Sequence, residues 1–163
     1  MLKLVVIILL FPLAFVSYAQ ELNVGLEFTG GPTPGDAYIV AMGPVIEFRP
    51  HHSFVSINSG LTFLVYKNES LFTIPLTLKA IIGKKFRFCP TLGGFIRANG
   101  NVGYSVGVHL DYQVKENLFI YLKGEYNRDY WKEEVPSHNW GTSEVTRHGS
   151  SFWIGIGLRV NLF

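Results

Sequence analysis

The C-terminal residues 152–163 alternate large hydrophobic side chains with glycine, arginine and asparagine, and they end on phenylalanine. Successive side chains of a β-strand point to opposite faces, so this pattern gives the strand one apolar face and one small or polar face. The same period of two recurs along the chain and predicts eight strands, at residues 21–29, 37–49, 55–65, 72–82, 86–97, 102–114, 118–127 and 152–163. No segment shows the period of a helix, so we expect an all-β domain.

The segments between the predicted strands differ in length. Those after the second, fourth and sixth strands are tight turns, whereas those after odd-numbered strands include residues 30–36 and the long segment 128–149. Short periplasmic turns, longer outer loops and an even number of antiparallel strands are typical of outer-membrane barrels with both termini inside. The connections therefore predict an up-and-down barrel.

The composition of the two strand faces decides between two classes of barrel. A soluble eight-stranded barrel such as a lipocalin has the same alternation with its apolar residues inside, so periodicity alone does not separate the classes. One face here is almost purely aliphatic and aromatic over whole strands, which would aggregate on a soluble surface. Exposing that face to lipid carries no free-energy cost, and closure of the sheet provides a hydrogen-bond partner for every backbone amide. We therefore predict an eight-stranded antiparallel up-and-down transmembrane β-barrel with its polar face lining the lumen.

The polar face carries the charged residues of the strands among glycine, serine and threonine. Four acids and six bases are nearly balanced, which predicts that they pair within a narrow lumen. With one histidine, the predicted lumen charge network comprises Glu27, Glu47, Arg49, Lys79, Arg87, Arg97, His109, Asp111, Lys123, Glu125 and Arg159.

The N-terminus has the pattern of a secretory signal peptide. Lys3 precedes an apolar run at residues 4–16, and the small residues Ser17 and Ala19 follow at the positions that a signal peptidase recognises. An anchoring helix is the alternative, but the run is shorter than the roughly 20 residues that cross a bilayer, and Pro12 interrupts it. We expect a signal peptide at 1–19 and a single barrel domain at 20–163.

Net charge and cysteine content narrow the function classes only slightly. The formal charge of +2 over 163 residues falls to +1 once Lys3 is removed, which is too weak a bias to indicate nucleic-acid binding. Cys89 is the only cysteine, so it has no partner for an internal disulfide.

Several segments together resemble a known family. They are the signal-like N-terminus, the LNVGLE strand at 22–27, the GYSVGV segment at 103–108 and the terminal phenylalanine. The chain resembles small eight-stranded outer-membrane β-barrel proteins of the porin-family type common in Bacteroidetes. The resemblance implies a monomer in the cell outer membrane that contacts outer-membrane lipids and lipopolysaccharide, and whose C-terminal strand is recognised by the outer-membrane assembly machinery. Phe163 departs from the pattern, because the outward phase falls on Leu158, Val160 and Leu162.

A few barrels of this kind modify lipid A with a histidine, a serine and a carboxylate. The candidate sets here are His109 with Ser105 and Asp111, and His138 and His148 with Glu133, Glu134 and Ser150. Sequence spacing cannot identify such a triad, because it is defined in space. We favour a lumen hydrogen-bonding role for His109 and solvated positions for the other two histidines. The adjacent His51 and His52 lack further ligands at metal-site spacing, and we expect no metal, no cofactor and no enzymatic activity.

Residues 128–149 are predicted to form the longest outer loop. Its aromatic residues Tyr130, Trp131 and Trp140 lie among charged residues, and this mixture suits contact with lipopolysaccharide, a partner protein or a host molecule. A solvated loop with incidental aromatics is the alternative. The sequence thus favours a structural or surface-interaction role without catalysis; the alternatives are a lipid A-modifying or lipid-binding barrel enzyme, and a narrow passive pore.

Overall fold

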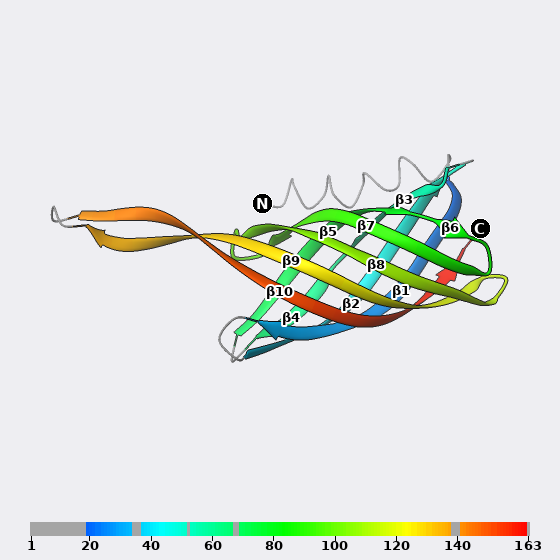
Figure 1. Ribbon diagram of the computed structural model, residues 1–163, viewed down its shortest axis with the longest axis horizontal. Helices are drawn as coiled ribbons and strands as arrows, with labels where there is room; N and C mark the ends of the chain where they lie inside the picture. Colours follow the sequence, from blue (N-terminus) through cyan, green and yellow to red (C-terminus); the bar gives the residue numbers. More distant parts are fainter. Residues whose placement is uncertain (1–18, 34–36, 52, 67–68, 138–140, 163) are drawn as a thin grey trace.

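The computed structural model describes residues 19–33, 37–51, 53–66, 69–137 and 141–162, and it consists of antiparallel strands that close on themselves (Figure 1). Nearly all of the predicted signal peptide and Phe163 lie outside the described residues. Within them, no helix is long and apolar enough to span a membrane. The strands are β1 (Ala19–Thr33), β2 (Ala37–Pro50), β3 (Val55–Gly60), β4 (Thr62–Tyr66), β5 (Glu69–Ala80), β6 (Ile82–Gly83), β7 (Phe86–Arg97), β8 (Val102–Lys115), β9 (Leu118–Ser137) and β10 (Gly141–Asn161).

These labelled strands make eight crossings. β3 and β4 are two parts of one crossing, because both pair with β2 and with β5 and only Leu61 separates them. β6 continues β5 after an interruption at Ile81, and both pair with β7. The ladder closes where β1 pairs with β10. The predicted eight-stranded antiparallel up-and-down barrel is therefore confirmed.

The long outer loop predicted at 128–149 is wrong. β9 and β10 continue as a paired hairpin to the Ser137↔Gly141 pair, beyond the last β8–β9 pair at Val102↔Tyr130. The seven residues of β9 beyond that pair extend roughly 20 Å at about 3.3 Å per residue. Alternation could not predict this segment, because a hairpin that projects from the barrel needs no apolar face; β-branched residues such as Val145 and Thr146 sustain it instead.

The two ends of the barrel are distinct (Figure 1). We call the end where β1 begins and β10 ends the terminal end, and the end from which the β9–β10 hairpin projects the hairpin end. The connections at both ends are short, contrary to the predicted contrast between turns and loops, because the strands extend further than their alternation indicates. In the turn between β6 and β7, Gly83 has a φ of 110°, a conformation that glycine adopts without strain.

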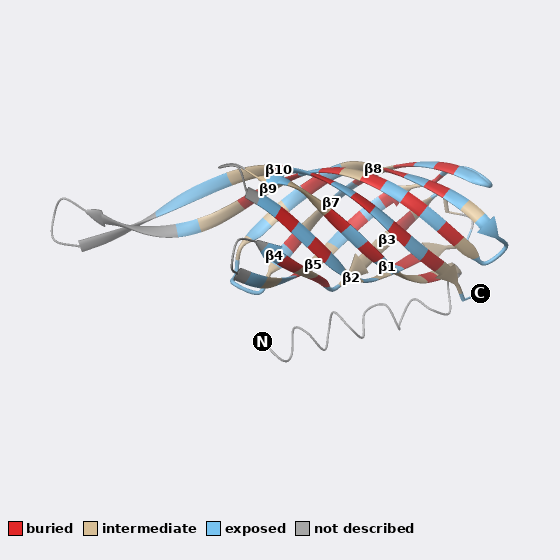
Figure 2. Cartoon of the chain, turned by 90° about the horizontal axis from the view of Figure 1, so that it is seen from below, coloured by how far each residue is buried: buried red, intermediate tan, exposed pale blue. Residues whose placement is uncertain are grey.

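Apolar side chains cover the outside of the barrel, and Figure 2 shows buried and exposed residues alternating along the strands. Polar and charged residues are buried on the inside. The outward set includes Leu26, Phe28, Val40, Met42, Phe72, Leu76, Leu78, Phe86, Leu92, Ile96, Val106, Leu122, Ile154, Ile156 and Leu158. An uninterrupted apolar exterior of this extent is atypical of a soluble monomer.

Candidate functional site

The inward residues nearest the terminal end form a first ionic cluster around Glu21. Arg49 Nη1 lies 2.8 Å from Glu21 Oε1, and Arg87 Nη1 lies 3.2 Å from Glu21 Oε2. Backbone carbonyls fix both arginines, because Arg49 donates to Ser53 and Arg87 donates to Lys84. This first cluster therefore ties β1, β2 and β7 together where the barrel opens.

A second cluster of two acids and two bases lies deeper in the lumen, with every member buried. Lys79 Nζ donates to Glu47 Oε2 at 2.8 Å and to Asp111 Oδ2 at 2.6 Å. Arg159 contacts the same two carboxylates. Cys89 Sγ lies 3.7 Å from Asp111 Oδ2. The formal charges of the four ionic groups cancel, as burial of charge requires.

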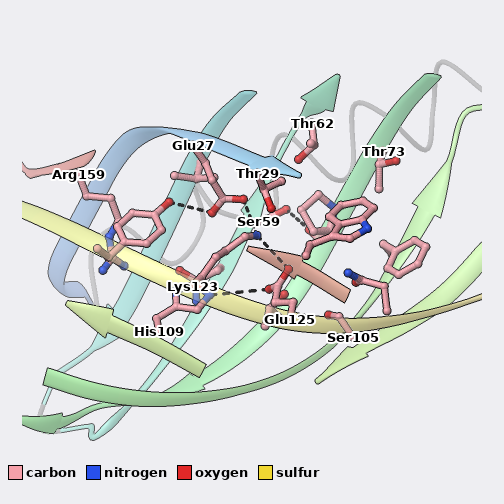
Figure 3. Close-up of a pocket in the computed structure, with 18 of the residues that line it drawn as sticks. Glu27, Thr29, Ser59, Thr62, Thr73, Ser105, His109, Lys123, Glu125 and Arg159 are labelled. Carbon is pink, nitrogen blue, oxygen red and sulfur yellow. Dashed lines mark hydrogen bonds and ion pairs between the residues drawn. The ribbon is translucent and has the colours of Figure 1, made fainter. Parts of the chain in front are cut away.

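A third cluster centres on Lys123. Its Nζ lies 2.5 Å from Glu27 Oε1 and 2.9 Å from Glu125 Oε2, and Figure 3 shows the three side chains converging. Tyr121 donates its hydroxyl to Glu27 Oε2 at 2.8 Å. The ring of His109 stacks on that of Tyr121 at 5.4 Å, and its Nε2 lies 3.7 Å from Glu125 Oε1.

An apolar cluster lies on the hairpin-end side of these charges. Ile39, Ala41, Leu64 and Trp153 are buried against one another, with Leu71 packed beside them. All of them occupy the inward phase, which is otherwise mostly polar but also carries the buried rings of Phe95, Phe119 and Tyr121. The lumen is thus filled by ionic clusters toward the terminal end and by an apolar cluster toward the hairpin end.

Cavities remain between these groups, and two of them are defined by the residues that line them. One lies beside the third cluster and measures about 70 Å³, which is room for a few water molecules. The other measures about 420 Å³ and lies at the hairpin end, where Arg97, Asp129 and Trp131 contribute to its lining.

No protein-family model matches the chain, and no curated protein matches it. Solved structures do. The N-terminal β-barrel domain of Pseudomonas aeruginosa OprF superposes with a TM-score of 0.58 at 13% identity, covering 86% of this chain and 97% of that one. Neisserial surface protein A superposes with a TM-score of 0.53 at 16% identity, and the match covers 86% of this chain and 95% of that one. The outer membrane protein AlkL superposes with a TM-score of 0.52 at 10% identity, and the match covers 89% of this chain and 92% of that one. The chain has the fold of a small outer-membrane β-barrel. Membership of the porin family stays a prediction, since identities this low show the fold alone.

The eleven residues of the predicted lumen network all lie on the inner side of this outer-membrane-type barrel, but they do not form one network. They divide among the three ionic clusters, except that Arg97 stands apart and pairs with Asp129 at 2.8 Å. The alternation places Glu21 and Tyr121 on the polar face, but the predicted network left them out, and neither Asp129 nor the apolar cluster was predicted. Their inward position in the alternation was the available signal. It is weak for Glu21 and Asp129, which lie near or beyond the ends of the predicted strands, and for the apolar cluster, whose side chains resemble those that face lipid.

The first candidate catalytic set, His109 with Ser105 and Asp111, is not assembled. Asp111 Oδ2 is engaged by Lys79 and Arg159, and His109 faces Glu125. Ser105 lies four residues from His109 along one strand, which is roughly 13 Å in extended backbone. A working triad needs its members within hydrogen-bond reach, and this set does not meet that condition.

The second candidate set lies on and near the hairpin. The ring of His148 lies 6.4 Å from that of Tyr130, and the Ser150 hydroxyl is hydrogen-bonded to Tyr126 at 2.8 Å. His138, like Trp140 of the predicted contact segment, lies outside the described residues. In the part of the chain that the structure describes, no group of histidine, cysteine and carboxylate residues is placed to hold a metal ion.

Gly157 makes room for the third cluster and provides a test of its packing. A Cβ at Gly157 would lie 2.1 Å from Tyr121 Cζ, and the Tyr121 ring is held by Glu27 and by the guanidinium of Arg159, 4.6 Å from its centroid. We expect Gly157→Ala to lower the free energy of unfolding by about 1–3 kcal/mol through overpacking. Gly124→Ala is the matched control, because its nearest neighbour, Phe152 Cζ, is 3.5 Å away. Urea unfolding from lipid vesicles measures both, and equal effects would contradict the role assigned to Gly157.

Proposed function

We propose that this protein is a monomeric outer-membrane surface protein whose barrel is closed to solutes and whose β9–β10 hairpin is presented outside the cell. The filled lumen carries the proposal. Interior ionic groups are matched in number: Glu21, Glu27, Glu47, Asp111, Glu125 and Asp129 against Arg49, Lys79, Arg87, Arg97, Lys123 and Arg159. An eight-stranded barrel is just wide enough for side chains to fill. A lumen occupied in this way supports a structural or interaction role rather than transport.

The closed ladder supports the monomeric state and the membrane location. Pairing of β1 with β10 leaves no open sheet edge within the barrel to recruit a second copy. The apolar exterior matches lipid, and the solved barrels that share the fold are outer-membrane proteins. Recognition of β10 by the assembly machinery and removal of residues 1–19 stay predictions. We propose no catalytic step, because Asp111 and His109 of the first candidate set are engaged by other residues and Ser105 is separated from His109.

The outward face near the hairpin end fits the lipid headgroups of an outer leaflet. Three cross-strand pairs of β9 and β10 form a strip on this face. From the barrel toward the hairpin tip they are Tyr126 with Phe152, Arg128 with Ser150, and Tyr130 with His148, and the first pair is exposed. Arg128 lies over the Tyr130 ring, 5.9 Å from its centroid, and Tyr104 lies 6.3 Å from the same ring. Apolar side chains followed by tyrosine and arginine are typical of a bilayer interface. We therefore propose that this strip contacts lipopolysaccharide phosphates.

Conductance in planar bilayers tests the closed lumen. We expect the purified protein to give no stable channel. A Tyr121→Ala/Trp153→Ala variant removes two large inward rings and is the matched comparison, since it enlarges the lumen without touching the outer face. A reproducible open level in the unmodified protein would contradict the proposal and favour the passive pore.

Cysteine labelling of whole cells tests the orientation. Native Cys89 is buried, so maleimide-polyethylene glycol should report on an introduced thiol. We expect labelling of a Thr146→Cys variant on intact cells, because Thr146 is exposed on the hairpin. Lys84→Cys places the thiol in an exposed turn at the terminal end and should react only after lysis. The reverse pattern would place the hairpin in the periplasm.

A further inference from the structure

The cavity of about 420 Å³ at the hairpin end has the size and shape of a small-molecule site. Its apolar lining is formed by Ile39, Leu64 and Leu71, which belong to or pack against the apolar cluster. Its wall is polar and aromatic, with Arg97, Asp129 and Trp131 from β7 and β9. The three ionic clusters of the lumen do not use this space.

Trp131 provides a flat apolar surface at this wall. It follows Asp129 in the inward phase of β9, just beyond the point where β8 begins. Its ring lies against the backbone of Gly149 on β10, because a Cβ there would be 3.3 Å from Trp131 Cζ3. The absence of a side chain at Gly149 therefore lets the indole lie flat over the hairpin while it lines the cavity.

The polar groups at the wall are unsatisfied although their charges cancel. Arg97 Nη2 and Asp129 Oδ1 form an ion pair at 2.8 Å. Arg97 Nε and Ser151 Oγ are buried, and neither has a hydrogen-bond partner among the described residues. Because Arg97 and Asp129 pair with each other, the cavity wall carries no surplus of either charge.

We propose that this cavity binds a neutral saccharide unit. Sugar hydroxyls both donate and accept, which matches the side-chain amides of Asn99 and Asn101 that line the cavity. The apolar face of a sugar ring packs on an indole such as Trp131. An ionic ligand would find its counter-charge already paired, and an alkyl chain would leave the polar groups unpartnered. Access to sugars outside the cell rests on the proposed orientation, whereas binding itself does not.

Saturation-transfer NMR on the folded protein tests the proposal in micelles of a detergent without a sugar headgroup. The probes are neutral hexoses, N-acetylhexosamines and their disaccharides, with glucuronate and decanoate as ionic and alkyl comparisons. We expect millimolar binding of at least one neutral sugar. Trp131→Ala and Asn101→Ala should each weaken it about tenfold, the scale of one lost stacking or hydrogen-bonding contact. Tyr38→Ala is the matched control, since Tyr38 is an exposed aromatic on the outer face of β2.

Three outcomes would overturn the saccharide site. They are no signal from any neutral sugar, preferential binding of glucuronate or decanoate, and binding that both Trp131→Ala and Asn101→Ala leave unchanged. Asn101 is half-buried in the turn before β8, so its replacement keeps the test valid if loss of Trp131 disturbs the hairpin. An inverted labelling pattern at Thr146→Cys and Lys84→Cys would overturn the orientation alone, and the two failures are therefore distinguishable.

Discussion

Asp111→Ala should lower the free energy of unfolding by about 3–5 kcal/mol, the range for removing one partner of a buried ionic group. The Asp111 side chain is 0% exposed, and its Oδ2 accepts from Lys79 and is contacted by Arg159. Without it, two buried cations share the single carboxylate of Glu47. Urea unfolding from lipid vesicles gives the free energy by linear extrapolation.

Two further variants identify the cause of the loss. Glu116→Ala removes one acid from an exposed turn and should change stability by no more than about 0.5 kcal/mol. Lys79→Met/Asp111→Leu removes one base and one acid, leaving Glu47 paired with Arg159. Apolar replacement of a buried pair is often neutral, so this double variant should be more stable than Asp111→Ala. A double variant that is less stable than the single one would show that packing, not charge, determines the effect.

The barrel could be predicted from the sequence because inside and outside impose opposite chemistry on alternate residues. β7 begins at Phe86 and ends at Arg97, as predicted, since Lys84 and Lys85 precede it and Asn99 and Gly100 follow it. The same reasoning fails at the hairpin, which faces neither lipid nor a lumen. A strand exposed on both faces leaves no binary pattern, and only β-propensity remains as a signal.

The lumen could be predicted as a set of residues but not as a set of contacts. Strand phase turns Lys79 inward, yet its partners Glu47 and Asp111 are each 32 residues away in sequence. Which charges meet depends on the stagger of strands around the closed sheet, and alternation carries no information about stagger. The apolar cluster was missed for a related reason, because Ile39 and Trp153 are inward hydrophobes and resemble the lipid-facing set.

Leu122→Arg should destabilise the barrel in lipid by about 2–4 kcal/mol, as for a charged residue near the middle of the bilayer. Leu122 is 54% exposed, and its cross-strand neighbours Leu110 and Ile156 are exposed apolar residues as well. It lies near the middle of the part of β9 that pairs with β8. A guanidinium placed there must lose hydration or deform the surrounding lipid, and no lumen acid can reach it through the wall of the barrel.

Depth gives this prediction its control. Ile82 is 57% exposed but lies next to the turn at the terminal end, so Ile82→Arg should cost no more than about 1 kcal/mol. Leu122 and Ile82 are about equally exposed, so we expect the two arginine substitutions to differ in their effect on the free energy of unfolding only if a bilayer surrounds the barrel. In water, as for a soluble barrel, both arginines would be hydrated and both variants would unfold like the parent. Urea unfolding of the two variants from lipid vesicles therefore decides whether the apolar exterior faces lipid, and equal stabilities would contradict the membrane location.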